Sequence, residues 1–142
     1  MADPIEVAKV GVESFGTADW DRARAALTSD SVYEEFATGR RIVGVDPIIE
    51  ANKGWKQAFP DARGTIRKAV ASGSTVTLEI TWEGTHTGDL VGPQGTIPAS
   101  GRSVSLPAAQ VVDVEGDKAK STRHYFDLMT LMSQIGAVPA GG

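Results

Sequence analysis

Apolar residues in the first part of the chain recur at helical spacing. Ile5, Ala8, Val12 and Phe15 lie three or four residues apart, which predicts one buried face on a helix. The same spacing and the breaks at its ends predict three helices, over residues 4–15, 19–27 and 46–59. Two short strands, 31–36 and 41–43, are predicted between the second helix and the third.

The second half of the chain shows mainly the alternation of strands. Apolar residues alternate with polar ones from Val76 to Trp82, and strands are predicted over residues 64–71, 75–87, 104–115 and 118–126. A last helix follows and ends at Gly136. Residues 88–102 are rich in glycine and proline without a period, so we expect a flap loop over a pocket. The tail, residues 137–142, is expected to be poorly ordered.

This order of elements predicts an α+β fold with one domain over residues 1–142. Helices on the concave side of a curved antiparallel sheet would enclose a cone-shaped cavity. The other face of the sheet must then meet solvent or a second subunit. We therefore expect a homodimer through the outer sheet face.

Charge and composition narrow the classes of partner. The net charge of -4 and the lack of a long basic run argue against nucleic acid. The chain has no cysteine, which excludes disulfides and thiolate chemistry. No signal peptide and no apolar run long enough for a membrane span are evident, so we expect a cytoplasmic protein without a membrane partner.

The last predicted hairpin supplies the first candidate site. With a two-residue turn at 116–117, Gln110 lies opposite Arg123, and alternation puts Arg123, Tyr125 and Asp127 on one face. A mixture of polar residues with small and apolar ones is typical of a ligand pocket. Tyr125 and Gln110 are therefore candidates for stabilising an oxyanion.

Two histidines are predicted to lie on opposite faces of the sheet. His86 continues the inward face of its strand, where it could relay a proton or be satisfied by backbone groups. His124 would point outward, towards a second subunit. Histidines on opposite faces do not form a metal site, and no other cluster has the spacing of metal ligands. We therefore predict no metal.

Three further residues are candidates for the pocket wall. Trp82 lies on the inward face of the long strand, and Tyr33 and Glu35 come from the first strand. Glu35 would serve as a second acid. A shift of one residue in the strand register would put Glu34 in its place.

Four segments resemble one family of proteins. YEEFATGRRIVG at 33–44, GWKQAFPDARG at 54–64, WEGTHTGDL at 82–90 and HYFDLMTLMSQIG at 124–136 are similar to SnoaL-like polyketide cyclases. These belong to the nuclear transport factor 2-like (cystatin-like) superfamily, with ketosteroid isomerases and limonene-epoxide hydrolases. The resemblance implies the cone-shaped fold and chemistry without a cofactor.

The resemblance also assigns a role to one residue. In the cyclases an aspartate at the start of the last helix is the general acid/base, and Asp127 holds that position. The family often has tryptophan four residues earlier, where this chain has Arg123. Such a cation could orient a carboxylate or other polar group of a ligand. A simpler interpretation is that Asp127 caps the helix.

The sequence thus leaves three functions open. The first is a cofactor-free cyclase or isomerase that acts on a small apolar carbonyl compound through Asp127. The second is an epoxide hydrolase similar to limonene-epoxide hydrolase, which needs two acids and a cation to hold an ordered water. The third is a non-catalytic domain that binds a small hydrophobic molecule.

Overall fold

A computed structural model describes residues 3–92 and 95–137 of the chain. The helices are α1 (Pro4–Thr17), α2 (Trp20–Ala25), α3 (Val45–Ala58) and α4 (Leu128–Gln134). The strands are β1 (Leu27–Glu35), β2 (Arg40–Val43), β3 (Arg63–Ser72), β4 (Thr75–Thr85), β5 (Leu90–Gly92), β6 (Gly95–Ile97), β7 (Ser103–Glu115) and β8 (Lys118–Phe126). Within the described ranges, no helix is long and apolar enough to cross a membrane.

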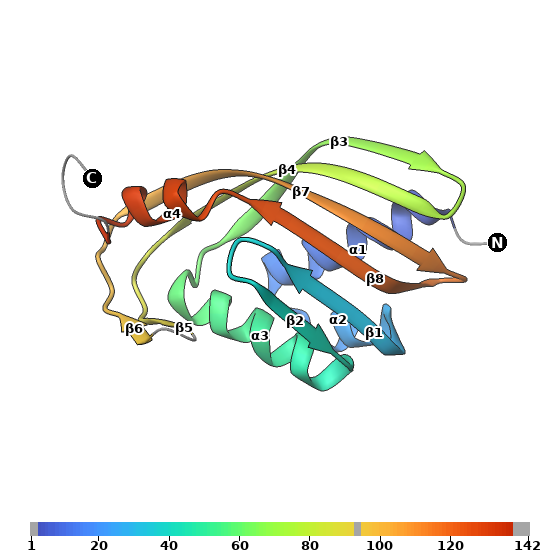
Figure 1. Ribbon diagram of the computed structural model, residues 1–142, viewed down its shortest axis with the longest axis horizontal. Coiled ribbons are helices and arrows are strands. Elements are labelled where there is room, and N and C mark those ends of the chain that lie inside the picture. Colours follow the sequence, from blue (N-terminus) through green and yellow to red (C-terminus); the bar gives the residue numbers. More distant parts are fainter. Residues whose placement is uncertain (1–2, 93–94, 138–142) are drawn as a thin grey trace.

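Six strands form one curved sheet in the order β2-β1-β8-β7-β4-β3. Helices α1, α2 and α3 lie on one side of it (Figure 1), so the predicted α+β fold is confirmed. One pair differs from the expected antiparallel sheet, because β1 runs parallel to β8. This pair brings the N-terminal half of the chain beside the last strand, and both strands contribute side chains to the interior.

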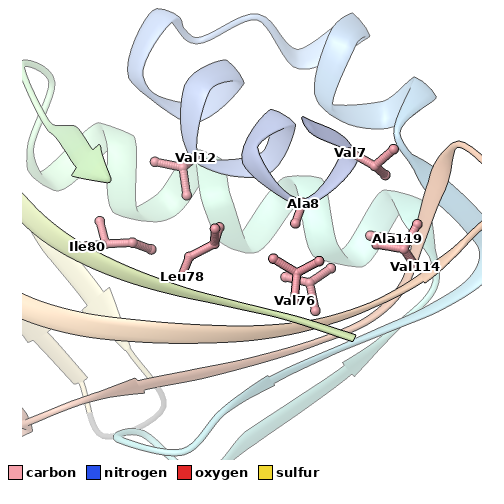
Figure 2. Close-up of a cluster of buried hydrophobic side chains, with 9 residues drawn as sticks. Val7, Ala8, Val12, Val76, Leu78, Ile80, Val114 and Ala119 are labelled. Atoms are coloured by element: carbon pink, nitrogen blue, oxygen red, sulfur yellow. The ribbon is translucent and has the colours of Figure 1, made fainter. Parts of the chain in front are cut away.

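The core is formed by α1 and the middle of the sheet. Val12 from α1 faces Leu78 and Ile80 from β4 (Figure 2), and all three are at most 2 % exposed. Burial of each such side chain stabilises the fold by roughly 1.5–3 kcal/mol. The sheet therefore has one apolar face, which the helices cover.

A one-residue bulge in β8 decides which of its side chains face the interior. The hairpin turn is as predicted, with Glu115 opposite Lys118. Val114 then pairs with Ala119, but Asp113 pairs with Ser121, so Lys120 is an extra residue on β8. Beyond this bulge each pairing is shifted by one residue from the predicted register, which exchanges the two faces of β8.

The expected flap contains a short hairpin. Strands β5 and β6 pair antiparallel, although the sequence showed no period there. His86 holds the end of this segment, since its N–H donates to the Arg102 carbonyl and its own carbonyl accepts from Gly101. Of the expected disordered tail, residues 138–142 lie outside the described residues.

Candidate functional site

A cavity of about 140 Å³ lies between the helices and the concave face of the sheet. Its wall is mostly apolar, with Ile48 and Phe59 from the α3 side and Leu106 and Val112 from β7. The side chains with polar groups in the wall include Tyr33, Trp82, Gln110, Thr122, His124, Asn52, Trp20 and Trp55. An apolar chamber with a few polar groups is the usual form of a small-molecule site.

Three of these side chains form a hydrogen-bonded chain. The Tyr33 hydroxyl lies 2.5 Å from His124 Nδ1, and the indole Nε1–H of Trp82 donates to His124 Nε2 at 3.1 Å. Tyr33 comes from β1, His124 from β8 and Trp82 from β4. Tyr33 is 8 % exposed and His124 is 7 % exposed. The chain is thus buried at the cavity wall and joins three strands.

The Trp82 indole determines how the chain is protonated. An indole N–H can only donate, so His124 Nε2 must be the accepting nitrogen. A neutral imidazole then carries its proton on Nδ1, which donates to the Tyr33 oxygen. The Tyr33 hydroxyl proton is left free for another acceptor. The chain is therefore arranged to present a hydrogen-bond donor to the cavity.

Burial keeps both titratable groups of the chain neutral. Desolvation lowers the pKa of His124 to about 4, against the opposing charge of Glu35. Desolvation also raises the pKa of Tyr33 well above its usual value, and the Glu35 charge adds to this rise. Near neutral pH, Tyr33 thus keeps its proton and His124 takes up none.

The prediction that His124 points outward towards a subunit is wrong. The bulge at Lys120 places it opposite Gln110, on the cavity face. One signal in the sequence indicated this. Ala119 and Phe126 are both apolar and an odd number of residues apart, so an uninterrupted strand could not bury both.

The same bulge overturns the predicted orientation of Arg123 and Tyr125. Arg123 Nη1 donates to Asp113 Oδ2 at 2.8 Å on the outer face of the sheet, where hydrogen bonds from Ser121 and Arg123 hold the pKa of Asp113 at about 2. Tyr125 is 44 % exposed and stacks on Phe36 with ring centroids 4.8 Å apart. Neither residue lines the cavity.

Asp127 caps α4 and lies outside the cavity wall. Its carboxylate accepts from the Met129 N–H at 3.2 Å and from Thr130 Oγ1 at 2.6 Å. These bonds, the one from Thr130 first, lower the pKa of Asp127. A carboxyl group that exchanges protons near neutral pH would need a raised pKa. The predicted orientation of Asp127 towards the cavity is therefore wrong, and its catalytic role stays a prediction.

Glu35 takes the buried position, as expected, but is enclosed by polar partners. It is 0 % exposed; Arg40 Nη2 donates to its Oε1 at 2.9 Å and Trp55 Nε1 to its Oε2 at 2.8 Å. Trp55 lines the cavity, whereas Glu35 does not. The Glu35 carboxylate thus holds Trp55 in place at the cavity wall, and Glu35 itself does not line the cavity.

His86 points inward, as expected, but it too lies outside the cavity wall. Its ring stacks on Phe59 with centroids 5.1 Å apart, and its Nδ1 accepts from the Ser100 N–H at 3.2 Å. Its Nε2 is buried without a hydrogen-bond partner among the described residues. Burial lowers the pKa of His86. A relay to the cavity would need a group between His86 and the ligand, so this role stays a prediction.

Acidic and histidine side chains are dispersed in the structure. Within residues 3–92 and 95–137, no group of three or more such ligands is placed to hold a metal ion. The donors at the cavity wall are instead hydroxyl, amide, indole and neutral imidazole groups. Such groups are suited to hydrogen bonding a neutral organic ligand.

Comparison with known proteins agrees with this architecture. A candidate SnoaL-like polyketide cyclase from Jannaschia sp. CCS1 is 19% identical, with a TM-score of 0.84 over 96% of this chain and 93% of that one. IdmH from Streptomyces antibioticus, a candidate polyketide cyclase, is 20% identical, with a TM-score of 0.80 over 95% and 99%. An M. tuberculosis epoxide hydrolase described as LEH-like is 20% identical, with a TM-score of 0.72 over 94% and 90%.

These solved structures share the fold of the chain. No curated protein is a significant match for it. The family model for SnoaL-like polyketide cyclases, however, matches residues 5–135, which is nearly the whole chain. The protein therefore belongs to the SnoaL-like polyketide cyclase family.

Proposed function

We propose that the protein is a cofactor-free cyclase or isomerase that acts on a small apolar carbonyl compound. The observation that carries this proposal is the pair formed by Tyr33 and His124 at the wall of an apolar cavity. Family membership supports the reaction class. Under this proposal, Tyr33 is the group that meets the substrate oxygen.

The chemistry follows from the direction of the hydrogen bonds. The free proton of Tyr33 would bond to the substrate carbonyl oxygen, and His124 Nδ1–H would support the Tyr33 oxygen from behind. Negative charge that develops on the carbonyl oxygen during enolisation is thereby stabilised by a preorganised donor. Removal of one such donor in other enzymes lowers kcat by about 10²–10³.

The cavity limits the size of the substrate. A cavity of roughly 150 Å³ can hold a molecule the size of benzene. With about 140 Å³, the space seen here suits a single ring, or one ring of a larger compound that extends through the opening. We therefore propose a monocyclic or short-chain carbonyl substrate.

Enolisation also needs a base for the proton that leaves carbon. Asp127 is the candidate implied by the family, and it would have to leave the α4 cap to reach the cavity. Asp127→Asn keeps a capping side chain, so it tests this half of the mechanism separately from the fold. Loss of turnover with an unchanged melting temperature would support Asp127 as the base.

The residues of the cavity wall favour a carbonyl substrate over an epoxide. Hydrolysis by a limonene-epoxide-hydrolase-like mechanism needs acids that hold a water. Among the described residues no aspartate lies in the cavity wall, and its one acidic residue, Glu83, is exposed. The carboxylate of Glu35, outside the wall, is taken up by Arg40 and Trp55. A wall that donates a hydrogen bond without a paired acid suits a carbonyl acceptor better.

The experiment compares the two tyrosines of the chain. Tyr33→Phe removes the proposed donor, whereas Tyr125→Phe alters an exposed ring on the outer face. With a panel of monocyclic ketones and epoxides, we expect turnover to fall by about 10²-fold or more in Tyr33→Phe and to stay near wild type in Tyr125→Phe. Equal turnover in wild type and Tyr33→Phe would refute the role of Tyr33. Binding without turnover in wild type would favour the non-catalytic binding domain.

The proposal includes the expected assembly and location. A homodimer through the outer sheet face would cover exposed apolar side chains such as Phe36 and Tyr125, which are 48% and 44% exposed. Sedimentation of wild type and Phe36→Asp tests this assembly. A cytoplasmic location remains part of the proposal, to be checked by fractionation of cells.

A further inference from the structure

The side-chain amide of Gln110 has no protein partner among the described residues and is accessible from the cavity. Gln110 is 7 % exposed and lines the cavity. Among the described residues its amide makes no side-chain hydrogen bond, although a carboxamide offers two donors and one acceptor oxygen. An amide that faces a cavity and has no partner within the protein is free to bond a ligand there.

The position of Gln110 in the sheet places it beside the Tyr33–His124 pair. Gln110 on β7 lies directly opposite His124 on β8 and opposite Leu78 on β4. Directly opposed side chains of antiparallel strands have Cβ atoms about 4.5–5.5 Å apart. A ligand whose oxygen meets Tyr33 would therefore have its neighbouring atoms close to the Gln110 amide.

We propose that Gln110 selects ligands that carry a second oxygen near the carbonyl group, such as hydroxy ketones and enols. A hydroxyl group can donate to Gln110 Oε1 and accept from Nε2, so it satisfies both ends of the amide. The carbonyl oxygen of the same ligand accepts from Tyr33, which is the part of this inference that rests on the proposed function. The substrate class is thereby narrowed to small carbonyl compounds with one further hydroxyl or enol oxygen.

A matched pair of ligands tests the selection. Cyclohexanone and 3-hydroxycyclohexanone differ by one hydroxyl group, and binding is followed by quenching of Trp20, Trp55 and Trp82, which all line the cavity. The additional hydrogen bond to Gln110 predicts that wild type binds 3-hydroxycyclohexanone roughly 3- to 10-fold more tightly than cyclohexanone. In Gln110→Met, a side chain of similar length without the amide, we expect this preference to vanish or reverse.

A second measurement needs no ligand. Because the amide is unpaired, Gln110→Met should raise the melting temperature of the free protein by about 2–8 °C. Gln134→Met is the matched control, since the Gln134 amide bonds to the N–H and carbonyl of Ser105 at 2.8 and 2.9 Å. We expect this control to melt at a lower temperature than wild type.

The outcomes separate this inference from the proposed function. A lower melting temperature in Gln110→Met would show that the amide is structural and would overturn the inference. The absence of a preference for the hydroxy ketone in wild type, or an unchanged preference in Gln110→Met, would overturn it as well. Unchanged binding of both ligands in Tyr33→Phe would instead refute the role proposed for Tyr33, whatever Gln110→Met shows.

Discussion

The buried imidazole of His124 makes the stability of the fold depend on pH. Burial lowers the pKa of His124 from its ordinary value of 6.5 to about 4. At a pH above the pKa of His124 in the unfolded chain, neither the folded nor the unfolded state binds the proton. His124 then causes no loss of stability. As the pH falls below that pKa, His124 is protonated in the unfolded chain but not in the folded one. The free energy of unfolding therefore decreases until the pH reaches the pKa of His124 in the folded state.

The size of this loss follows from the shift in pKa. Each pKa unit corresponds to about 1.36 kcal/mol. The lowered pKa of His124 should therefore reduce the free energy of unfolding by roughly 2 kcal/mol between about pH 7 and pH 4.5. Domains of this kind have about 5–15 kcal/mol of total stability. Protonation of His124 would also place an N–H on Nε2, directly facing the indole N–H of Trp82, which now donates to that nitrogen. The effect should therefore be large enough to measure.

Urea unfolding of wild type and His124→Gln over this pH range is the assay. The range ends at about pH 4.5 because the pKa of Asp113 is lowered to about 2 and that of Asp127 is lowered too. Protonation of these two carboxylates in the folded state therefore affects stability at more acid pH. We expect wild type to lose about 2 kcal/mol more than the variant on acidification. His86→Gln is measured in parallel, since burial lowers the pKa of His86 too. Parallel profiles for wild type and His124→Gln would refute a lowered pKa at His124.

Two further substitutions test the contacts around the cavity. Trp82→Phe removes the donor to His124 Nε2, so we expect the imidazole ¹⁵N shifts of His124 to move towards the Nε2–H tautomer and binding of ketones to weaken. Gly88→Ala should lower the free energy of unfolding by about 1–3 kcal/mol, measured with urea, because its Cβ would lie 1.9 Å from the Gln57 carbonyl oxygen.

Matched controls make both tests specific. Trp20→Phe alters another indole at the cavity wall and should leave the ¹⁵N shifts of His124 unchanged. An unchanged tautomer in Trp82→Phe would contradict the assigned direction of the hydrogen bonds. Gly54→Ala adds a Cβ in α3 with nothing within 4 Å, so it should stabilise the helix by about 0.5–1 kcal/mol. A neutral effect of Gly88→Ala would contradict the close contact at Gln57.

The fold was predictable because local pattern and global arrangement agree. The helical spacing of Ile5, Ala8 and Val12 matches the face of α1 that packs on the sheet, and the alternation from Val76 to Trp82 matches the buried face of β4. The parallel pairing of β1 and β8 was not predicted, since it joins strands about 90 residues apart through long-range contacts. Periodicity reports which face is buried, but it does not report which strands are neighbours.

The candidate site was only partly predictable for a related reason. Tyr33, Trp82 and Gln110 were placed on inward faces by alternation within strands, and the structure puts all three in the cavity wall. His124 and Arg123 were assigned to the wrong faces, because alternation was carried across the bulge of β8. A single extra residue changes no composition and barely changes hydropathy, yet it reverses every later side chain in the strand.

The bulge at Lys120 is therefore a determinant of the site, and its removal gives the sharpest test of this reasoning. Deletion of Lys120 would turn Arg123 and Tyr125 into the apolar cavity and His124 and Phe126 out of it. An unpaired buried cation alone costs several kcal/mol, so we expect no cooperative unfolding transition by circular dichroism. Lys120→Ala keeps the residue count and removes an exposed ion pair with Glu115, and it should stay within about 0.5 kcal/mol of wild type. A deletion variant that folds with native stability would show that β8 can shift its register, and the order of residues along this strand would then not fix which of them meet the ligand.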